Sequence, residues 1–156
     1  GQFQDRSASR RILCLLEDPE HQVRLSAALA LAECLKDGTV IPDVEKLLES
    51  PRPQVRRAAL STLAGFVSKP SARKIAKLLE DPDTETRGLA AAVFGGLGTR
   101  ADVPRLARLL EDPSSAVQGS ALMGFRALTG QGFPKVEDAR QWWREHRHDT
   151  EFRFQE

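Results

Sequence analysis

Apolar and polar positions recur along this chain at a nearly constant interval. Two leucines followed by a glutamate, an aspartate or serine, and a proline occur four times, and the first leucine stands at positions 15, 47, 78 and 109. The repeat period is therefore 32, 31 and 31 residues. A fixed period of this size indicates an array of stacked repeats, each of which is one supersecondary unit.

The residues before each leucine pair predict a first helix in every repeat. An apolar residue lies three positions before the first leucine, at Ile12, Val44, Ile75 and Leu106. Apolar positions at i, i+3 and i+4 form one face of an amphipathic helix. Proline cannot continue a helix, and it disfavours the helical conformation at the residue before it. The prolines that end the first helix are Pro19, Pro51, Pro82 and Pro113.

The residues after each proline predict a second helix. Its apolar columns are spaced by four, four and three residues, which places them on one helical face. The columns are Val23, Val55, Thr86 and Val117; then Ala27, Ala59, Ala90 and Ala121; then Leu31, Leu63, Phe94 and Phe125; then Cys34, Phe66, Leu97 and Leu128. The alanine column allows neighbouring helices to approach closely. No strand pattern interrupts the helices, so the sequence predicts an all-α fold.

Two polar columns repeat with the apolar ones. An aspartate precedes each proline except at Ser50, and an arginine follows each Val/Thr column except at Gln118. We expect these side chains to bond to each other or to turn carbonyls of the adjacent repeat, as a ladder that ties repeat to repeat. The residues of this polar ladder are Asp18, Arg24, Arg56, Asp81, Arg87 and Asp112.

These residues carry a family resemblance. The order Asp-Pro, Val-Arg, Ala, Leu resembles the HEAT repeat, in particular the short bacterial variety also seen in phycobilin lyases, from about residue 9 to 147. The resemblance implies helix pairs stacked into a right-handed α-α superhelix, or solenoid, with the first helices on the convex side and the second helices lining the concave side. The Trp142-Trp143 pair is similar to the last helix of bacterial HEAT-repeat proteins.

The resulting domain plan is a single domain of four HEAT-like repeats closed by a capping helix. We expect Trp142 or Trp143 to plug the end of the core, because the last repeat of a solenoid otherwise exposes its core. The outer face of that helix, with Arg140, Arg144, Glu145 and Arg147, is expected to face water. The predicted ranges are 1–148 for the domain, 8–37, 40–68, 71–99 and 102–129 for the repeats, about 136–147 for the cap and 149–156 for a C-terminal tail.

Charge and composition limit the partners. The chain holds 23 Lys and Arg against 22 Asp and Glu, a net charge of +1, and this balance argues against a general nucleic-acid binder. Without an 18-residue apolar run or an apolar leader near the start, we expect no membrane association and a cytoplasmic location. Cys14 and Cys34 are expected to be buried, apolar in character and too far apart for a disulfide.

The N-terminal end of the predicted array differs from the C-terminal end. The leading Gly predicts an expression remnant or a processed fragment, and no polar cap precedes the first helix. Either further repeats or domains adjoin this end in the intact protein, or the end is an interface.

The sequence offers no catalytic constellation. Gly95-Gly96-Leu97-Gly98 follows a helix instead of a strand, so close helix packing and a C-cap explain it better than a phosphate loop. His146 and His148 stand two positions apart and point to different sides of a helix, which disfavours a metal site. We therefore expect no enzyme activity, no cofactor and no metal.

The most informative surface is the concave face. Residues two and six positions after the Val/Thr column should point there, and they are mostly apolar or small, which suggests a groove for an apolar or helical peptide. These residues are Leu25, Leu29, Arg57, Ser61, Gly88, Ala92 and Met123, with Gly119 in the same column as Gly88. Partial burial against the next helix is the alternative reading.

The predicted function is thus a non-catalytic scaffold for a protein or peptide. The first alternative is a bilin-lyase-like enzyme component, which rests on fold-level similarity alone. The second is a HEAT-like nucleic-acid binder, for which Arg56 and Arg57 are the only adjacent basic pair on a second helix.

Overall fold

The computed structural model describes residues 11–34, 40–64 and 69–149, and each regular element in these ranges is a helix. The predicted all-α fold is thereby confirmed. The chain divides into two compact units, Gly1–Lys74 and Ile75–Glu156, and the boundary falls inside one helix, α5.

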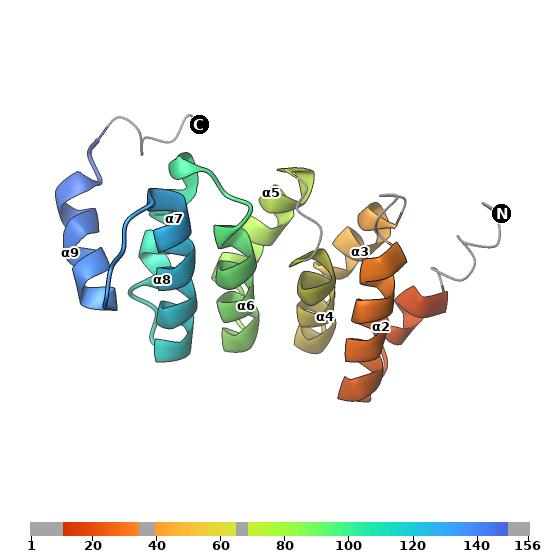
Figure 1. Ribbon diagram of the computed structural model, residues 1–156. Coiled ribbons are helices and arrows are strands. Elements are labelled where there is room, and N and C mark those ends of the chain that lie inside the picture. Colours follow the sequence, from red (N-terminus) through yellow and green to blue (C-terminus); the bar gives the residue numbers. More distant parts are fainter. Residues whose placement is uncertain (1–10, 35–39, 65–68, 150–156) are drawn as a thin grey trace. The chain divides into compact units, whose positions relative to one another are not determined.

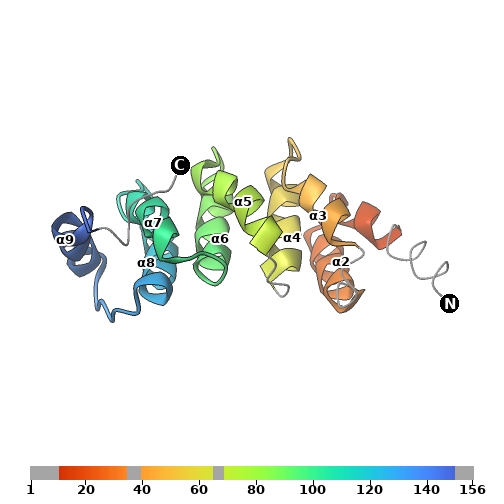
Figure 2. The same cartoon turned by 90° about the horizontal axis from the view of Figure 1, so that it is seen from above.

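Unit 1 contains the first two repeats. Residues 11–15 are helical and precede the first Asp-Pro turn. The two second helices of this unit pack against each other, and α3 lies in another layer, packed on α4 (Figures 1 and 2). The remaining helices are α2 (His21–Cys34), α3 (Ile41–Leu47), α4 (Pro53–Ala64) and the first part of α5 (Lys69–Lys77).

Unit 2 contains the last two repeats and the cap. Its second helices, α6 and α8, stand side by side, α7 packs against α8, and α9 packs on the remaining side of α8 (Figure 1). The helices of this unit are η2 (Leu78–Glu80), α6 (Thr84–Gly95), η3 (Arg100–Asp102), α7 (Val103–Leu109), α8 (Ser115–Thr129) and α9 (Val136–His146).

Local sequence sets the helix ends. Pro53 is the first residue of α4. The first N–H groups of a helix have no partner within the helix, so the missing N–H of proline costs nothing there. The side chain of Asp83 caps α6 by accepting a 2.9 Å hydrogen bond from the N–H of Thr86, whereas Ser114 makes no such bond at the start of α8. Gly130 ends α8 with φ of 71°, in the left-handed region that glycine tolerates.

The predicted apolar columns form the core of each unit. The alanine column is almost fully buried, at 3 % exposure for Ala27 and 0 % for Ala59, Ala90 and Ala121. Phe94 and Phe125 are the largest fully buried side chains of the column that follows. Cys34 and Phe66 lie outside the residues whose side chains are described.

Two glycines allow α6 and α8 to touch backbone to backbone. A Cβ atom on Gly95 would lie 2.3 Å from the Cα of Gly124, which is far inside van der Waals contact. Close packing at Gly95 therefore agrees with the sequence-based interpretation. A C-cap glycine was also expected in this stretch. Gly96 is the C-cap residue of α6, with an ordinary φ of −84°.

The Asp-Pro turn has one hydrogen-bond pattern in all four repeats. The side-chain oxygen of the residue before proline accepts from the N–H two positions later, because proline itself offers no N–H. The distances are 2.8 Å for Asp18 to Glu20, 3.3 Å for Ser50 to Arg52, 2.9 Å for Asp81 to Asp83 and 2.9 Å for Asp112 to Ser114. The residue before proline thus shapes the turn. Ser50 takes the place of aspartate in the second repeat and accepts the same hydrogen bond at a longer distance.

The second polar column closes the same turn from the other side. A side-chain N–H six residues later donates to the carbonyl oxygen of the residue before proline. The distances are 2.8 Å for Arg24 to Asp18, 2.8 Å for Arg56 to Ser50, 2.9 Å for Arg87 to Asp81 and 2.6 Å for Gln118 to Asp112. The carbonyl belongs to the arginine's own repeat, so the expected bond to a carbonyl of the adjacent repeat is wrong for these four contacts.

The contact of Arg87 with Asp112 does join two repeats. Arg87 donates from Nε and Nη2 to the carboxylate of Asp112, at 2.8 and 3.2 Å, and Asp112 is 7 % exposed. The hydrogen bond from Arg87 lowers the pKa of Asp112 against the opposing effect of burial. In unit 1 an exposed pair, Arg52 with Glu17, joins the first two turns.

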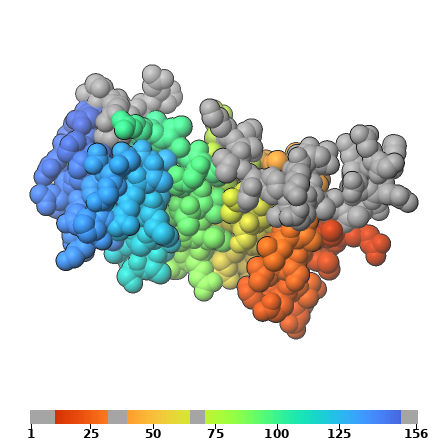
Figure 3. Space-filling model, in the orientation of Figure 1, coloured from red at the N-terminus to blue at the C-terminus, as the bar shows by residue number. Residues whose placement is uncertain are grey.

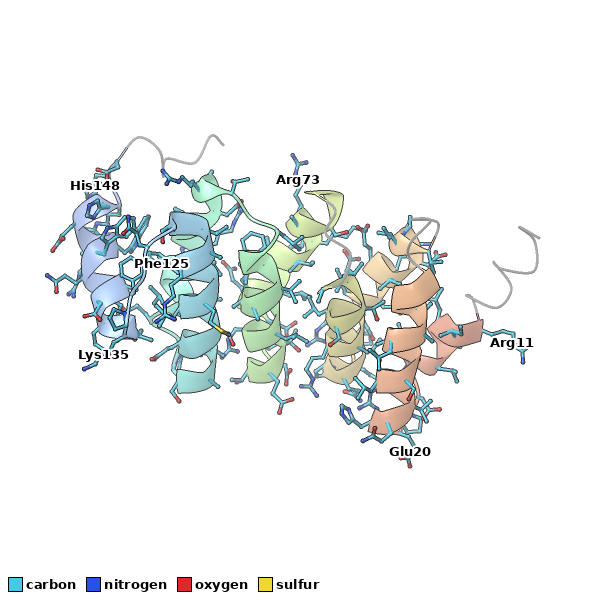
Figure 4. The ribbon with its side chains drawn as sticks, in the orientation of Figure 1. Arg11, Glu20, Arg73, Phe125, Lys135 and His148 are labelled. Carbon is cyan, nitrogen blue, oxygen red and sulfur yellow. The ribbon has the colours of Figure 1, made fainter. Side chains whose placement is uncertain are left out.

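The cap closes unit 2 with aromatic rings and a half-buried arginine, Arg140. Phe125 points from α8 toward α9 (Figure 4), and its ring centroid lies 5.8 Å from that of Trp142 and 6.4 Å from that of Trp143. Arg140 was expected to face water, and this is wrong. Its Nε donates to the carbonyl of Leu110 at 2.9 Å and lies 3.2 Å from the Glu111 carboxylate, because α9 lies across the last turn.

Replacing Gly95 with alanine tests the contact between α6 and α8. The added methyl group would overlap the backbone of Gly124, so we expect a loss of about 1–3 kcal/mol of unfolding free energy. The matched control is Gly119→Ala in α8, where a Cβ meets nothing within 4 Å, and it should stabilise by up to about 1 kcal/mol. Urea unfolding followed by circular dichroism measures both, and equal effects would contradict the close contact.

Replacing Asp112 with asparagine tests the link between repeats. A buried charge-assisted pair contributes about 1.5–3 kcal/mol, which is the loss expected at pH 7. The folded-state pKa lies below the ordinary 3.8, so this contribution is present above that value and is lost as the pH falls through the lower folded-state pKa. The difference between wild type and variant should therefore shrink toward acid pH.

The control for this experiment is Asp43→Asn. Asp43 pairs with Lys46 at 2.7 Å, but both side chains are exposed, so the expected loss is below about 1 kcal/mol. A loss for Asp112→Asn that is the same at pH 3 and pH 7 would show that the charge is not responsible.

Candidate functional site

The predicted site residues fall into two columns that differ in exposure. The column six positions after Val/Thr is exposed in every repeat, and Leu29 and Met123 reach 65 % and 58 %. We call this column, within each unit, the open face. It consists of Leu29 and Ser61 on α2 and α4 in unit 1, and of Ala92 and Met123 on α6 and α8 in unit 2.

The column two positions after Val/Thr borders the next helix. Leu25 is 42 % exposed, whereas Arg57, Gly88 and Gly119 are half-buried. A Cβ on Gly88 would lie 3.7 Å from Cγ2 of Val117 on the neighbouring helix, which is ordinary contact distance. Of the two readings left open by the sequence, partial burial therefore fits the half-buried members of this column, and exposure fits the open face.

Most of the large apolar side chains that water reaches stand on the two predicted columns, and two of them belong to the open face. Among the described residues, the exposed large apolar side chains are Leu15, Leu25, Leu29 and Met123, and three of these four stand on the two predicted columns. Leu25 and Leu29 are four residues apart and therefore project from one side of α2. Figure 3 shows α6 and α8 adjoining as one continuous outer surface in unit 2. Exposed apolar side chains on such a surface offer apolar contact.

Unit 1 holds a buried polar cluster that the sequence did not reveal. Glu45 on α3 is 8 % exposed and accepts hydrogen bonds from Ser71 at 2.5 Å and Lys74 at 2.9 Å. Burial raises the pKa of Glu45, but the bonds from Ser71 and Lys74 and the lysine charge outweigh it, so that the pKa lies below the ordinary 4.5. The signal in the sequence was a glutamate beside the buried Val44, followed by Ser71 and Lys74 in the next first helix. This cluster joins α3 to α5.

His146 has a structural role in the cap. The ring of His146 stacks on Trp142 with centroids 4.3 Å apart, and its Nδ1 lies 2.8 Å from the carbonyl oxygen of Trp142. Within residues 11–34, 40–64 and 69–149, no three His, Cys, Asp or Glu side chains come together in a group suited to a metal ion.

Cys14 was expected to be buried, and this is wrong: its side chain is exposed. Leu16, two residues later, is fully buried. Residues two positions apart on a helix point to nearly opposite sides, so Cys14 faces away from the core. None of the helices in the described ranges has the length and the apolar character needed to cross a bilayer.

Comparison with known proteins agrees with the repeat architecture. A family model described as HEAT repeats matches residues 8–76, which cover the first two repeats. A search of curated proteins gave no match. HEAT repeats are commonly protein-interaction scaffolds and are generally non-catalytic. The matched residues, the all-α fold and the helix pairs of each unit, which are consistent with an α-solenoid, together support a HEAT-repeat protein.

Proposed function

We propose that the chain is a non-catalytic scaffold that binds a protein or peptide on the open face of its second helices. The observation that carries the proposal is the exposure of Leu29 and Met123, at 65 % and 58 %, in a column that is exposed in all four repeats. Isolated exposed leucines are common on protein surfaces, but here the exposure follows the repeat and therefore one side of each helix layer.

The spacing of the exposed leucines favours a helical ligand in unit 1. Leu25 and Leu29 present an i, i+4 apolar pair on α2, and the neighbouring α4 adds Ser61 and the half-buried Arg57. An amphipathic helix offers apolar anchors at the same spacing and polar groups at its edges. We expect such a partner to place apolar residues against Leu25 and Leu29.

Introducing a negative charge at the open face tests the proposal. Leu29→Glu and Met123→Glu, singly and together, should leave the melting temperature within about 2 °C, because surface substitutions cost little. Both should weaken partner binding by tenfold or more, since a charge replaces an apolar contact in a desolvated interface. Partners are captured on the immobilised chain, identified, purified and then titrated by calorimetry against each variant.

The control substitution is Arg73→Glu, at an exposed position on the first helix α5. It changes charge by two units and should leave binding unchanged. A purified partner that binds the Leu29→Glu, Met123→Glu double variant as tightly as wild type would refute the assignment of the open face. A sharp fall in helix content and melting temperature would show instead that the two positions belong to the core.

A further inference from the structure

The first repeat buries its apolar residues less than its sister repeats do. Leu15 is 43 % exposed, whereas Leu109, at the same place in the fourth repeat, is 7 % exposed. Val23 is half-buried, whereas the equivalent Val55 and Val117 are 0 % and 1 % exposed. The difference concerns identical or nearly identical side chains, so it arises from what lies next to them.

The later repeats of each unit show which neighbour is involved. In unit 2 a Cβ on Gly124 of α8 would lie 3.0 Å from the carbonyl oxygen of Ala91 and 3.1 Å from the Cα of Gly95, both on α6. This side of a second helix therefore receives the second helix of the preceding repeat. The equivalent residue of α4 is Thr62, which is 0 % exposed, and α4 packs on α2.

No helix among the described residues covers the same side of α2. The residue equivalent to Gly124 and Thr62 is Ala30, fifteen positions after the first leucine in each case, and it is exposed. One turn earlier, Ser26 is exposed as well, whereas its equivalents Ala58 and Ser120 are half-buried. The small side chains leave room for another helix to approach the backbone, as at the contact between α6 and α8.

We propose that this side of α2, together with Leu15 of the preceding helix, docks a helix pair of the HEAT type, stacked as the repeat containing α6 stacks on α8. The docked second helix would place small residues opposite Ala30, as Ala91 and Gly95 stand opposite Gly124. Its companion helices would cover Leu15, since η2 and α6 pack against α7, which carries the buried Leu109. This inference is independent of a ligand on the open face.

The C-terminal end of a second copy does not fit this surface. There α9 already covers α8, and its outward positions Glu137, Arg144 and Glu145 are exposed and charged. Burying these charged side chains against Leu15 and Ala30 would cost desolvation that apolar and small side chains do not offset. Head-to-tail stacking of copies is therefore disfavoured, and a helix pair with an apolar, small-residue stacking side is the matching occupant.

The experiment supplies such a helix pair from the chain itself. A second copy of residues 70–100 is inserted between Arg6 and Ser7 of the full chain. These 31 residues equal one repeat period, so the inserted copy keeps the register from one leucine pair to the next. We expect the melting temperature to rise by roughly 5 °C or more, because each neighbour interface adds to the stability of an array. Hydrogen exchange along α2 should slow.

The substitution Ala30→Arg identifies the surface. In the original chain Ala30 is exposed, so the melting temperature should change by less than about 2 °C. In the extended chain the arginine would enter the new interface, and the melting temperature should fall by roughly 5 °C or more. The control is Ser61→Arg on the open face, which should be neutral in both chains.

Two results would overturn the proposal. The first is an extended chain that is no more stable than the original and tolerates Ala30→Arg equally well. The second is an original chain that sedimentation shows to be a dimer and that Ala30→Arg converts to a monomer, because a second copy would then occupy the surface.

Discussion

The hydrogen bonds of the Asp-Pro turn are the constraint on which the repeats depend. Proline stops the first helix, and the chain must reverse within a few residues, which leaves backbone groups of the turn without helical partners. The residue before proline accepts from one freed N–H, and the arginine or glutamine six residues later donates to its carbonyl. Two groups at the start of the second helix are thereby bonded to the residue that ends the first helix. These bonds fix the geometry of the helix pair.

The polar contacts specify geometry, and the apolar columns supply most of the stability. A single hydrogen bond contributes on the order of 1 kcal/mol, whereas burial contributes roughly 25 cal/mol for each Å² of apolar surface. In unit 2 the two effects meet between α6 and α8. Arg87 holds the carboxylate of Asp112 at one end, and Gly95 lies against Gly124 at the other. On the open face of these helices, Ala92 and Met123 are exposed, so this side contributes less to the burial of apolar surface.

The ends of an array impose different requirements from its middle. At the C-terminal end α9 replaces a following repeat: Trp142 and Trp143 cover Phe125, and Arg140 reaches the carbonyl of Leu110 near the last turn. At the N-terminal side of α2, the described residues include no comparable cover for Leu15. A surface that is built like an internal junction but lies open is a physical reason to look for a stacking partner there.

The sequence by itself determined the repeats, the helix boundaries near each proline and the buried columns, because period, proline and apolar spacing act over a few residues of one helix. It also singled out Leu29 and Met123 as residues of an exposed column. Tertiary structure decided that Arg140 turns inward, that Cys14 is exposed, that Glu45 is buried with Ser71 and Lys74, and that the column of Gly88 borders the next helix. These features depend on which side of one helix meets a helix from another repeat. That choice is made by contacts about 25 to 30 residues apart in the chain, such as Arg87 with Asp112, and the pattern within a single helix does not contain it.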